Sequence, residues 1–175
     1  LPDNALYVVS TAHLFEHNKG DTVIIVLRER KDDGTYKRRD HTIAIRSKGK
    51  PLWVRHAKDD SAVLRLAEPL PVSAGSVPLT ALADETRLKD AGLRICSPLF
   101  VFTYPKSFEG NSAGFPVARQ AIVASHPLTP IEPSHKFLAD FTAFAGDSGG
   151  PVFVAGADGH PLVVGIVIAQ FRHDE

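Results

Sequence analysis

The sequence predicts an all-β protein, and three observations support this fold class. Short runs of apolar and β-branched residues recur along the chain, with turn-forming residues between them. Helical periodicity is confined to one brief segment, residues 84–92. The strand-like runs also form two clusters on either side of a segment rich in proline, alanine and serine. This pattern favours two small barrels side by side.

The first cluster consists of short predicted strands and one clear turn. Asp33-Gly34 is a favoured hairpin turn pair. The charged residues around it carry both signs, which is typical of a solvated hairpin tip rather than of a phosphate site. The predicted strands cover residues 5–11, 22–30, 40–46, 51–57 and 61–66.

The second cluster follows a connector over residues 70–82 and the short helical segment, which Gly92 ends. Its predicted strands cover residues 94–103, 115–124, 151–155 and 162–170. We therefore predict an N-terminal barrel domain over residues 1–76, a connector over 77–92 and a C-terminal barrel domain over 93–175.

Composition indicates a globular protein, with 43% hydrophobic and 23% charged residues in 175. Lysine and arginine total 20 and aspartate and glutamate total 20, so we expect no nucleic-acid partner. The longest apolar run, residues 161–169, is too short for a membrane span. Cys96 is the only cysteine, which excludes a disulfide framework and fits the cytoplasm and the bacterial cell envelope alike. We expect Cys96 to be a buried structural residue.

One segment stands out as a site for chemistry: Gly146-Asp147-Ser148-Gly149-Gly150-Pro151. A serine hydroxyl is a poor nucleophile unless a base takes its proton and hydrogen-bond donors stabilise the resulting oxyanion. Gly146 lets the backbone turn so that its own amide and that of Ser148 can serve as those donors. A glycine-rich turn of this kind indicates an activated serine rather than a simple connection.

A histidine and an aspartate in the first cluster supply a candidate base and its partner. His13 directly follows a strand-like run. Strand alternation places Asp60 on the apolar side of the strand that begins beside it, and a buried carboxylate needs a partner such as a histidine N–H. Asp59 is the alternative, but counting from it puts Ser61 where a small apolar residue belongs.

Three motifs in fixed order resemble the chymotrypsin-like serine proteases: STAH at His13, DSAVL at Asp60 and GDSGGP at Ser148. The short, disulfide-free bacterial branch, which includes Deg-type proteases, is most similar. The resemblance extends from about residue 6 to residue 170, and GDSGGP is its most specific part. It implies two six-stranded antiparallel β-barrels of the chymotrypsin-like type.

The resemblance implies a serine endopeptidase with His13, Asp60 and Ser148 as its catalytic residues. His13 would take and return the serine proton, while Asp60 would orient the imidazole and stabilise its cation. The amides of Gly146 and Ser148 would form the oxyanion hole. Such an enzyme acts on polypeptide substrates and requires neither a cofactor nor a metal.

The resemblance also implies where a substrate side chain binds. Thr142 stands at the base of the primary pocket and carries no charge, which predicts against a preference for lysine or arginine at P1. Residues 164–170 resemble the strand that lines this pocket, although its end departs from the family's pattern. We expect a small or uncharged P1 side chain and the substrate-binding residues Thr142, Ala143, Ile168, Ala169 and Gln170.

Two other functions compete with this interpretation. His13-Leu14-Phe15-Glu16-His17 matches H-x-x-E-H, the inverted zinc-peptidase motif, in which both histidines bind the metal. That motif needs a helix of several turns, whereas here we expect His17 to be exposed in a short turn. The second alternative is a catalytically inactive, protease-like binding domain, against which the presence of all three candidate residues counts.

The ends of the sequence differ from the implied family pattern. Two strands normally precede the strand that leads to the histidine, and a closing strand and a helix normally follow the last pocket strand. We therefore expect domains or chain segments to be missing at both ends of residues 1–175.

Overall fold

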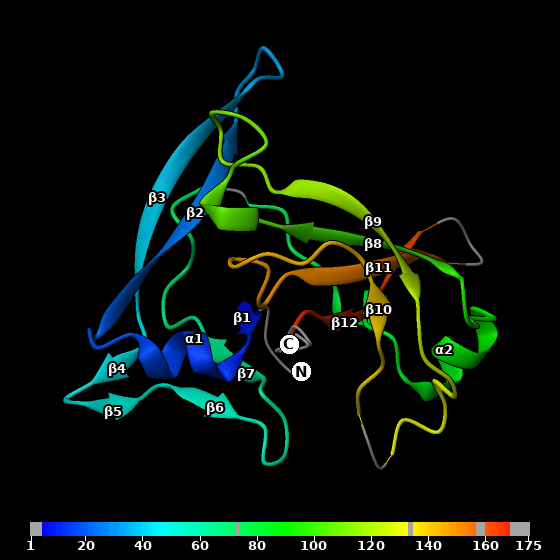
Figure 1. The fold of residues 1–175 in the computed structure, drawn as a ribbon. Helices are drawn as coiled ribbons and strands as arrows, with labels where there is room; N and C mark the ends of the chain where they lie inside the picture. The colour runs from blue at the N-terminus through cyan, green and yellow to red at the C-terminus, as the bar shows by residue number, and fades with distance from the viewer. Residues whose placement is uncertain (1–4, 73, 133–134, 157–159, 169–175) are drawn as a thin grey trace. The chain divides into compact units, whose positions relative to one another are not determined.

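Strands dominate the computed structural model, which describes residues 5–72, 74–132, 135–156 and 160–168 (Figure 1). They account for 38% of it and helices for 11%, which confirms the all-β class. The closure of two barrels stays a prediction. The chain forms two compact units, Leu1–Ser76 with Phe108–Pro116, and Val77–Ser107 with Val117–Glu175. The predicted domain boundaries also stay predictions.

Among the residues that the structure describes, each unit combines several strands with one short α-helix. The first contains β1 (Tyr7–Ser10), α1 (Ala12–His17), β2 (Thr22–Arg30), β3 (Tyr36–Ala44), β4 (Arg46–Ser47), β5 (Lys50–Pro51), β6 (Trp53–Arg55) and β7 (Ala62–Arg65). The second contains η1 (Leu79–Ala81), α2 (Glu85–Asp90), β8 (Pro98–Thr103), η2 (Pro105–Ser107), β9 (Val117–Val123), β10 (Ala139–Asp140), β11 (Pro151–Ala155) and β12 (Pro161–Ile166). The elements η1 and η2 are short 3₁₀ turns.

The first unit contains a three-stranded sheet in the order β1-β7-β6. Burial alternates along β7, so Ala62 and Leu64 face inward, as strand periodicity predicts. The helix α1 packs on this inner face through Ala12 and Phe15, which belong to the same buried cluster. The sheet thus supports the helix that carries His13.

The helix α1 replaces the short turn that we predicted around His17. A helix this short is marginal alone, and contacts from distant parts of the chain stabilise both its ends. The Asp60 carboxylate accepts a hydrogen bond from the His13 amide, and the Arg46 guanidinium donates to the Phe15 carbonyl at 2.7 Å. His17 is exposed, as expected.

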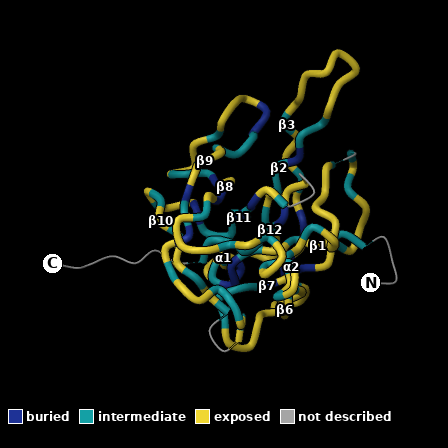
Figure 2. Tube along the Cα trace, turned by 90° about the vertical axis from the view of Figure 1, so that its right-hand side faces the viewer, coloured by how far each residue is buried: buried dark blue, intermediate teal, exposed yellow. Residues whose placement is uncertain are grey.

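The strands β2 and β3 form a long antiparallel hairpin whose tip is exposed (Figure 2). Its pairing continues to Arg30 opposite Tyr36, so β3 begins before the predicted residue 40. Gly34 in the turn has a φ of +81°, a conformation that suits the predicted Asp33-Gly34 pair.

The segment Phe108–Pro116 packs on this hairpin, although it lies far from it in the sequence. Arg28 Nε donates a hydrogen bond to the Gly114 carbonyl at 2.9 Å. Arg38 forms an ion pair with Glu109 of the same segment. These contacts explain why the segment belongs to the first unit.

The second unit is built on a five-stranded sheet in the order β10-β9-β8-β11-β12. Burial alternates along β8, where Leu99, Val101 and Thr103 face inward. Since β11 pairs with both β8 and β12, Pro151 begins a strand in the interior of the sheet. The sheet therefore anchors the C-terminal end of the turn that carries Ser148.

Before β8 the chain holds the predicted short helix and an unexpected turn. Asp84 caps α2 by accepting from the Arg87 amide at 2.8 Å. Cys96 is exposed, which corrects the expectation of a buried cysteine. It has a φ of +68° in a turn, so the strand begins only at Pro98 rather than at residue 94. Over the residues that the structure describes, no helix is long and apolar enough to cross a membrane.

Candidate active site

In the first unit, His13 and Asp60 form a close side-chain pair. The Nδ1 atom of His13 lies 2.5 Å from Oδ2 of Asp60, and the His13 amide donates to Oδ1 of Asp60 at 3.0 Å. The two side chains are 29% and 30% exposed. One carboxylate therefore fixes both the backbone and the ring of the same histidine, and the second ring nitrogen, Nε2, stays on the other side of the ring from this contact.

Neighbouring charges distinguish Asp60 from Asp59. The Asp59 carboxylate lies 3.1 Å from Nδ1 of His56, so its near partner is a different histidine. Arg55, which forms an ion pair with Glu16, also attracts the Asp60 carboxylate electrostatically. Of these two aspartates, Asp60 is therefore the one that contacts His13.

The surroundings of Asp60 favour its ionised form. Partial burial by itself raises the pKa of the Asp60 carboxyl. The hydrogen bonds from the ring and amide of His13, together with the positive charges of His13 and Arg55, outweigh this effect. The pKa of Asp60 therefore lies below its ordinary value, and the carboxylate is present throughout the neutral range.

In the second unit, the turn that carries Ser148 adopts a backbone that only glycine fits well. Gly146 has a φ of +94°, and a Cβ atom there would lie 2.3 Å from the Tyr104 carbonyl oxygen. A Cβ atom on Gly150 would lie 2.3 Å from Cγ2 of Thr103. The glycines are thus required by the close approach of this turn to the chain around β8.

Asp147 is 2% exposed, and it is the one charged residue that is fully buried among those the structure describes. Its Oδ1 atom lies 2.5 Å from Nη2 of Arg119, and its Oδ2 atom accepts from the Phe144 amide at 2.6 Å. A buried carboxylate requires this kind of compensation. Arg119 was not among the predicted site residues. Its position in the inward-facing pattern Val117, Arg119, Ala121 of a strand is the signal that could have found it.

The backbone around Ser148 leaves two amides available. Within the described ranges, neither the Gly146 amide nor the Ser148 amide donates a hydrogen bond. By contrast, the Gly149 amide donates to the Val167 carbonyl at 2.8 Å, and the Val167 amide donates to the Gly150 carbonyl at 2.9 Å. These last bonds join the turn to the chain that follows β12.

The predicted pocket residues are only partly within the described chain. Thr142 is exposed, and its carbonyl accepts from Nη1 of Arg119 at 2.5 Å. Ala143 and Ile168 are half-buried. Ala169 and Gln170 lie outside the described residues. The structure therefore brings Thr142 and the Ser148 turn together through Arg119, and it says nothing of the last two residues.

The family model for trypsin matches residues 1–175. The chain belongs to the trypsin family. The members of this family are serine proteases, hydrolases that act on polypeptide substrates. Among curated proteins, none matches the chain. The similarity to the bacterial, Deg-type branch stays a prediction.

The zinc motif of this trypsin-family chain lies within α1, and two of its residues have other partners. His13 contacts Asp60 through Nδ1, and Glu16 forms its ion pair with Arg55. In the described ranges, no cluster of three or more histidine, cysteine, aspartate or glutamate side chains is arranged to hold a metal ion.

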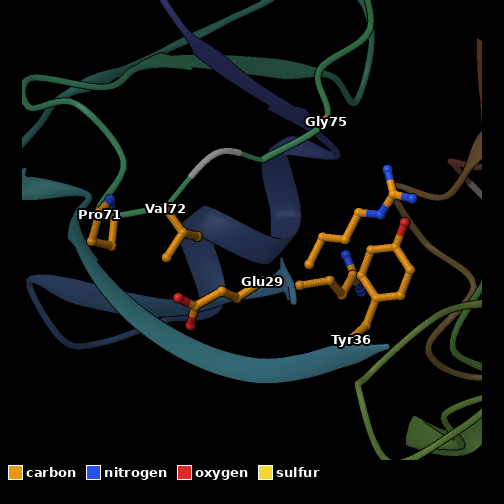
Figure 3. Close-up of a pocket in the computed structure, with 7 residues that line it drawn as sticks. Glu29, Tyr36, Pro71, Val72 and Gly75 are labelled. Atoms are coloured by element: carbon orange, nitrogen blue, oxygen red, sulfur yellow. The ribbon is translucent and has the colours of Figure 1, made fainter. Parts of the chain in front are cut away.

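A hollow of about 390 Å³ lies beside the β2–β3 hairpin and contains none of the predicted site residues (Figure 3). Its lining residues are Arg28, Glu29, Arg30, Tyr36, Pro71, Val72 and Gly75. Arg28 is held by the Gly114 carbonyl, so its charge is already engaged. Nothing about this hollow connects it with the chemistry of the trypsin family.

We predict that Gly146→Ala destabilises this trypsin-family chain by about 1 to 3 kcal/mol more than Gly34→Ala does. Both glycines have positive φ, at +94° and +81°. At Gly146 an added Cβ atom would collide with the Tyr104 oxygen, whereas at Gly34 it would meet no atom within 4 Å. Urea unfolding of the two variants measures the difference. Equal losses of stability would show that the close approach of Gly146 to Tyr104 does not contribute to the free energy of unfolding.

We predict that Asp60→Asn removes part of the pH dependence of stability. Because the pKa of Asp60 is lowered in the folded state, the unfolded chain binds its proton first as the pH falls. This stabilising contribution is fully present above the ordinary value of 3.8 and is lost as the pH falls through the folded-state pKa. Urea unfolding between about pH 5 and pH 3 should therefore show a shallower decline for Asp60→Asn. The exposed Asp32→Asn variant should keep the wild-type slope, and an unchanged slope in Asp60→Asn would contradict the prediction.

Proposed function

We propose that this chain is a serine endopeptidase in which His13, Asp60 and Ser148 act as a catalytic triad and the amides of Gly146 and Ser148 form the oxyanion hole. The observation that carries the proposal is the two-point contact between His13 and Asp60, with Nδ1 to Oδ2 at 2.5 Å and amide to Oδ1 at 3.0 Å. The glycine-dependent turn around Ser148 supports it independently.

The contact between His13 and Asp60 supports the role of His13 as general base. A base in this reaction needs one tautomer, with its proton on the nitrogen that faces the carboxylate. Asp60 engages Nδ1 and is ionised at neutral pH, so it favours the proton there and leaves Nε2 as the acceptor. Its charge also stabilises the imidazolium that forms during the reaction.

The proposed reaction proceeds in two stages. Ser148 Oγ attacks the peptide carbonyl carbon while Nε2 of His13 takes the hydroxyl proton, and a tetrahedral oxyanion forms. The carbon–nitrogen bond then breaks, His13 donates the proton to the leaving amine, and the acyl group stays on Ser148. Water attacks this ester with His13 as base, releases the carboxylic acid and restores the serine. The proposal requires Ser148 to come within hydrogen-bond reach of His13 in the reacting enzyme.

The free amides support the proposed oxyanion hole. In the described chain, the Gly146 and Ser148 amides have no acceptor of their own, whereas neighbouring amides of the same turn do. Donors that are held in place before reaction stabilise the developing charge without reorganisation. Loss of one such donor typically costs about 3 to 4 kcal/mol of transition-state stabilisation.

For specificity, we propose a small or uncharged side chain at P1. The support for this is the chemistry of Thr142, which offers no carboxylate to a basic substrate group. Ala143 and Ile168 are the other described residues in this proposal, and both are small or apolar.

The proposed nucleophile is tested by intact-mass measurement after incubation with a fluorophosphonate. We expect a single adduct on the wild-type chain and none on Ser148→Ala. His13→Ala should slow labelling on the order of 10⁴-fold, because it removes the base. His17→Ala, in the same helix, should label at the wild-type rate, as should Asp59→Asn beside Asp60.

The same measurement distinguishes the alternatives. A folded wild-type chain that takes no adduct would support an inactive, protease-like binding domain. Loss of peptidase activity in His17→Ala equal to that in His13→Ala would support the zinc-peptidase interpretation, because that mechanism needs both histidines.

The proposed specificity is tested with a peptide library randomised at P1. We expect cleavage mainly after small or uncharged residues such as alanine and valine. Thr142→Asp should shift the preference toward lysine and arginine, because it places a carboxylate at the proposed base of the pocket. A wild-type profile dominated by arginine, lysine, aspartate or glutamate at P1 would contradict the proposal.

A further inference from the structure

Arg119 is a charged residue on the inward face of a strand. It lies in β9 between Val117 and Ala121, and its side chain is only 17% exposed. Its guanidinium carbon lies 5.1 Å from the centre of the Phe141 ring and 5.7 Å from that of Phe144. An arginine in such a setting needs several acceptors, because its charge has lost most of its water.

Three acceptors from separate parts of the second unit meet this guanidinium. Nη2 lies 2.5 Å from Oδ1 of Asp147 and donates to Oγ1 of Thr103 at 2.7 Å. Nη1 donates to the Thr142 carbonyl at 2.5 Å. Thr103 belongs to the end of β8, whereas Thr142 and Asp147 bracket the loop that leads to Ser148. One side chain therefore ties this loop to the sheet at both of its ends.

The Asp147 carboxylate transmits this restraint to the backbone beside it. Its second oxygen accepts from the Phe144 amide at 2.6 Å, and the Asp147 amide donates back to the Phe144 carbonyl at 3.2 Å. Gly146 and Ser148 are the covalent neighbours of Asp147, so the orientation of their amides follows from where Asp147 is held. Without Arg119, the Asp147 carboxylate would be buried without a positively charged partner. A rearrangement of the loop that turns this carboxylate toward water would then lower the free energy.

We propose that Arg119 is a positioning residue that holds the oxyanion turn and the base of the primary pocket in one arrangement. The inference rests on the proposed function, because it assigns Arg119 a role in presenting the Gly146 and Ser148 amides. Arg119 touches neither substrate nor the reacting atoms in this role. It acts through Asp147 on the turn and through the Thr142 carbonyl on the pocket.

The planar shape of the guanidinium is essential to the proposal. Arginine offers donors in fixed, divergent directions, so it can reach a carboxylate, a hydroxyl and a carbonyl together. Lysine keeps the charge but presents one nitrogen on a flexible chain. Arg119→Lys should therefore retain the fold while it loosens the turn.

The test compares Arg119→Ala and Arg119→Lys with Arg28→Ala, which removes a partly buried arginine that also donates to a backbone carbonyl but lies in the first unit. We measure thermal unfolding, the fluorophosphonate labelling rate, and kcat and KM for a peptide ester. Arg119→Ala should lower kcat and the labelling rate about 10²- to 10³-fold, and Arg119→Lys at least about tenfold. Arg28→Ala should lower the unfolding temperature while kcat stays within about twofold of wild type.

Chemical rescue separates positioning from general stability. Guanidinium chloride at about 20 mM, far below denaturing concentrations, should raise the labelling rate of Arg119→Ala at least about tenfold and leave that of Arg28→Ala unchanged. If Arg119→Ala does not fold, Arg119→Lys carries the test through its kcat and labelling rate.

Three results would bear on the proposal differently. Labelling of a folded Arg119→Ala or Arg119→Lys at the wild-type rate overturns the positioning role while the proposed function stands. Equal activity losses in Arg119→Ala and Arg28→Ala, without rescue by guanidinium, overturn it in favour of a purely structural role. A wild-type chain that labels no better than Ser148→Ala removes the proposed function itself.

Discussion

The buried carboxylate of Asp147 is the constraint on which the second unit's site depends. A charge that is 2% exposed must be paired, and Arg119 pairs it at 2.5 Å. Removing one partner from such a pair typically costs about 3 to 5 kcal/mol, because the other charge is left without water. The ion pair between Asp147 and Arg119 therefore holds the turn around Ser148. Because Arg119 faces inward from β9, this ion pair attaches the turn to the sheet.

Asp60 in the first unit and Asp147 in the second are held by the same kind of interaction. Each uses one oxygen for a backbone amide and the other for a side chain: Asp60 binds the amide and ring of His13, and Asp147 binds the Phe144 amide and Arg119. Because a carboxylate is rigid, the two contacts restrain a backbone segment and a side chain relative to each other. Each carboxylate thus fixes the position of a chain segment that lies outside the strands.

Steric exclusion complements these electrostatic restraints. The approach of Gly146 to the Tyr104 carbonyl, and of Gly150 to Thr103, leaves no space for a side chain. The turn consequently lies directly against the end of β8, while β11 continues from it into the interior of the sheet. Close packing on one side and a paired strand on the other restrict the positions that Ser148 can take. The sheet therefore restricts the position of the Ser148 turn together with the glycines of the motif.

The all-β class, the hairpin turn at Gly34 and the inward face of β7 follow from the amino-acid sequence alone, because strand alternation and turn conformations are local properties. The sequence motifs also predict His13, Asp60 and Ser148 as site residues, and their catalytic roles stay proposals. The helical state of α1 needed the folded chain, since Asp60 and Arg46 support its ends from distant segments. The exposure of Cys96 and the pairing of Arg119 with Asp147 likewise emerged only on folding. These outcomes depend on contacts between residues far apart in the chain. The hydrophobic periodicity of one segment does not show which distant segment will contact it.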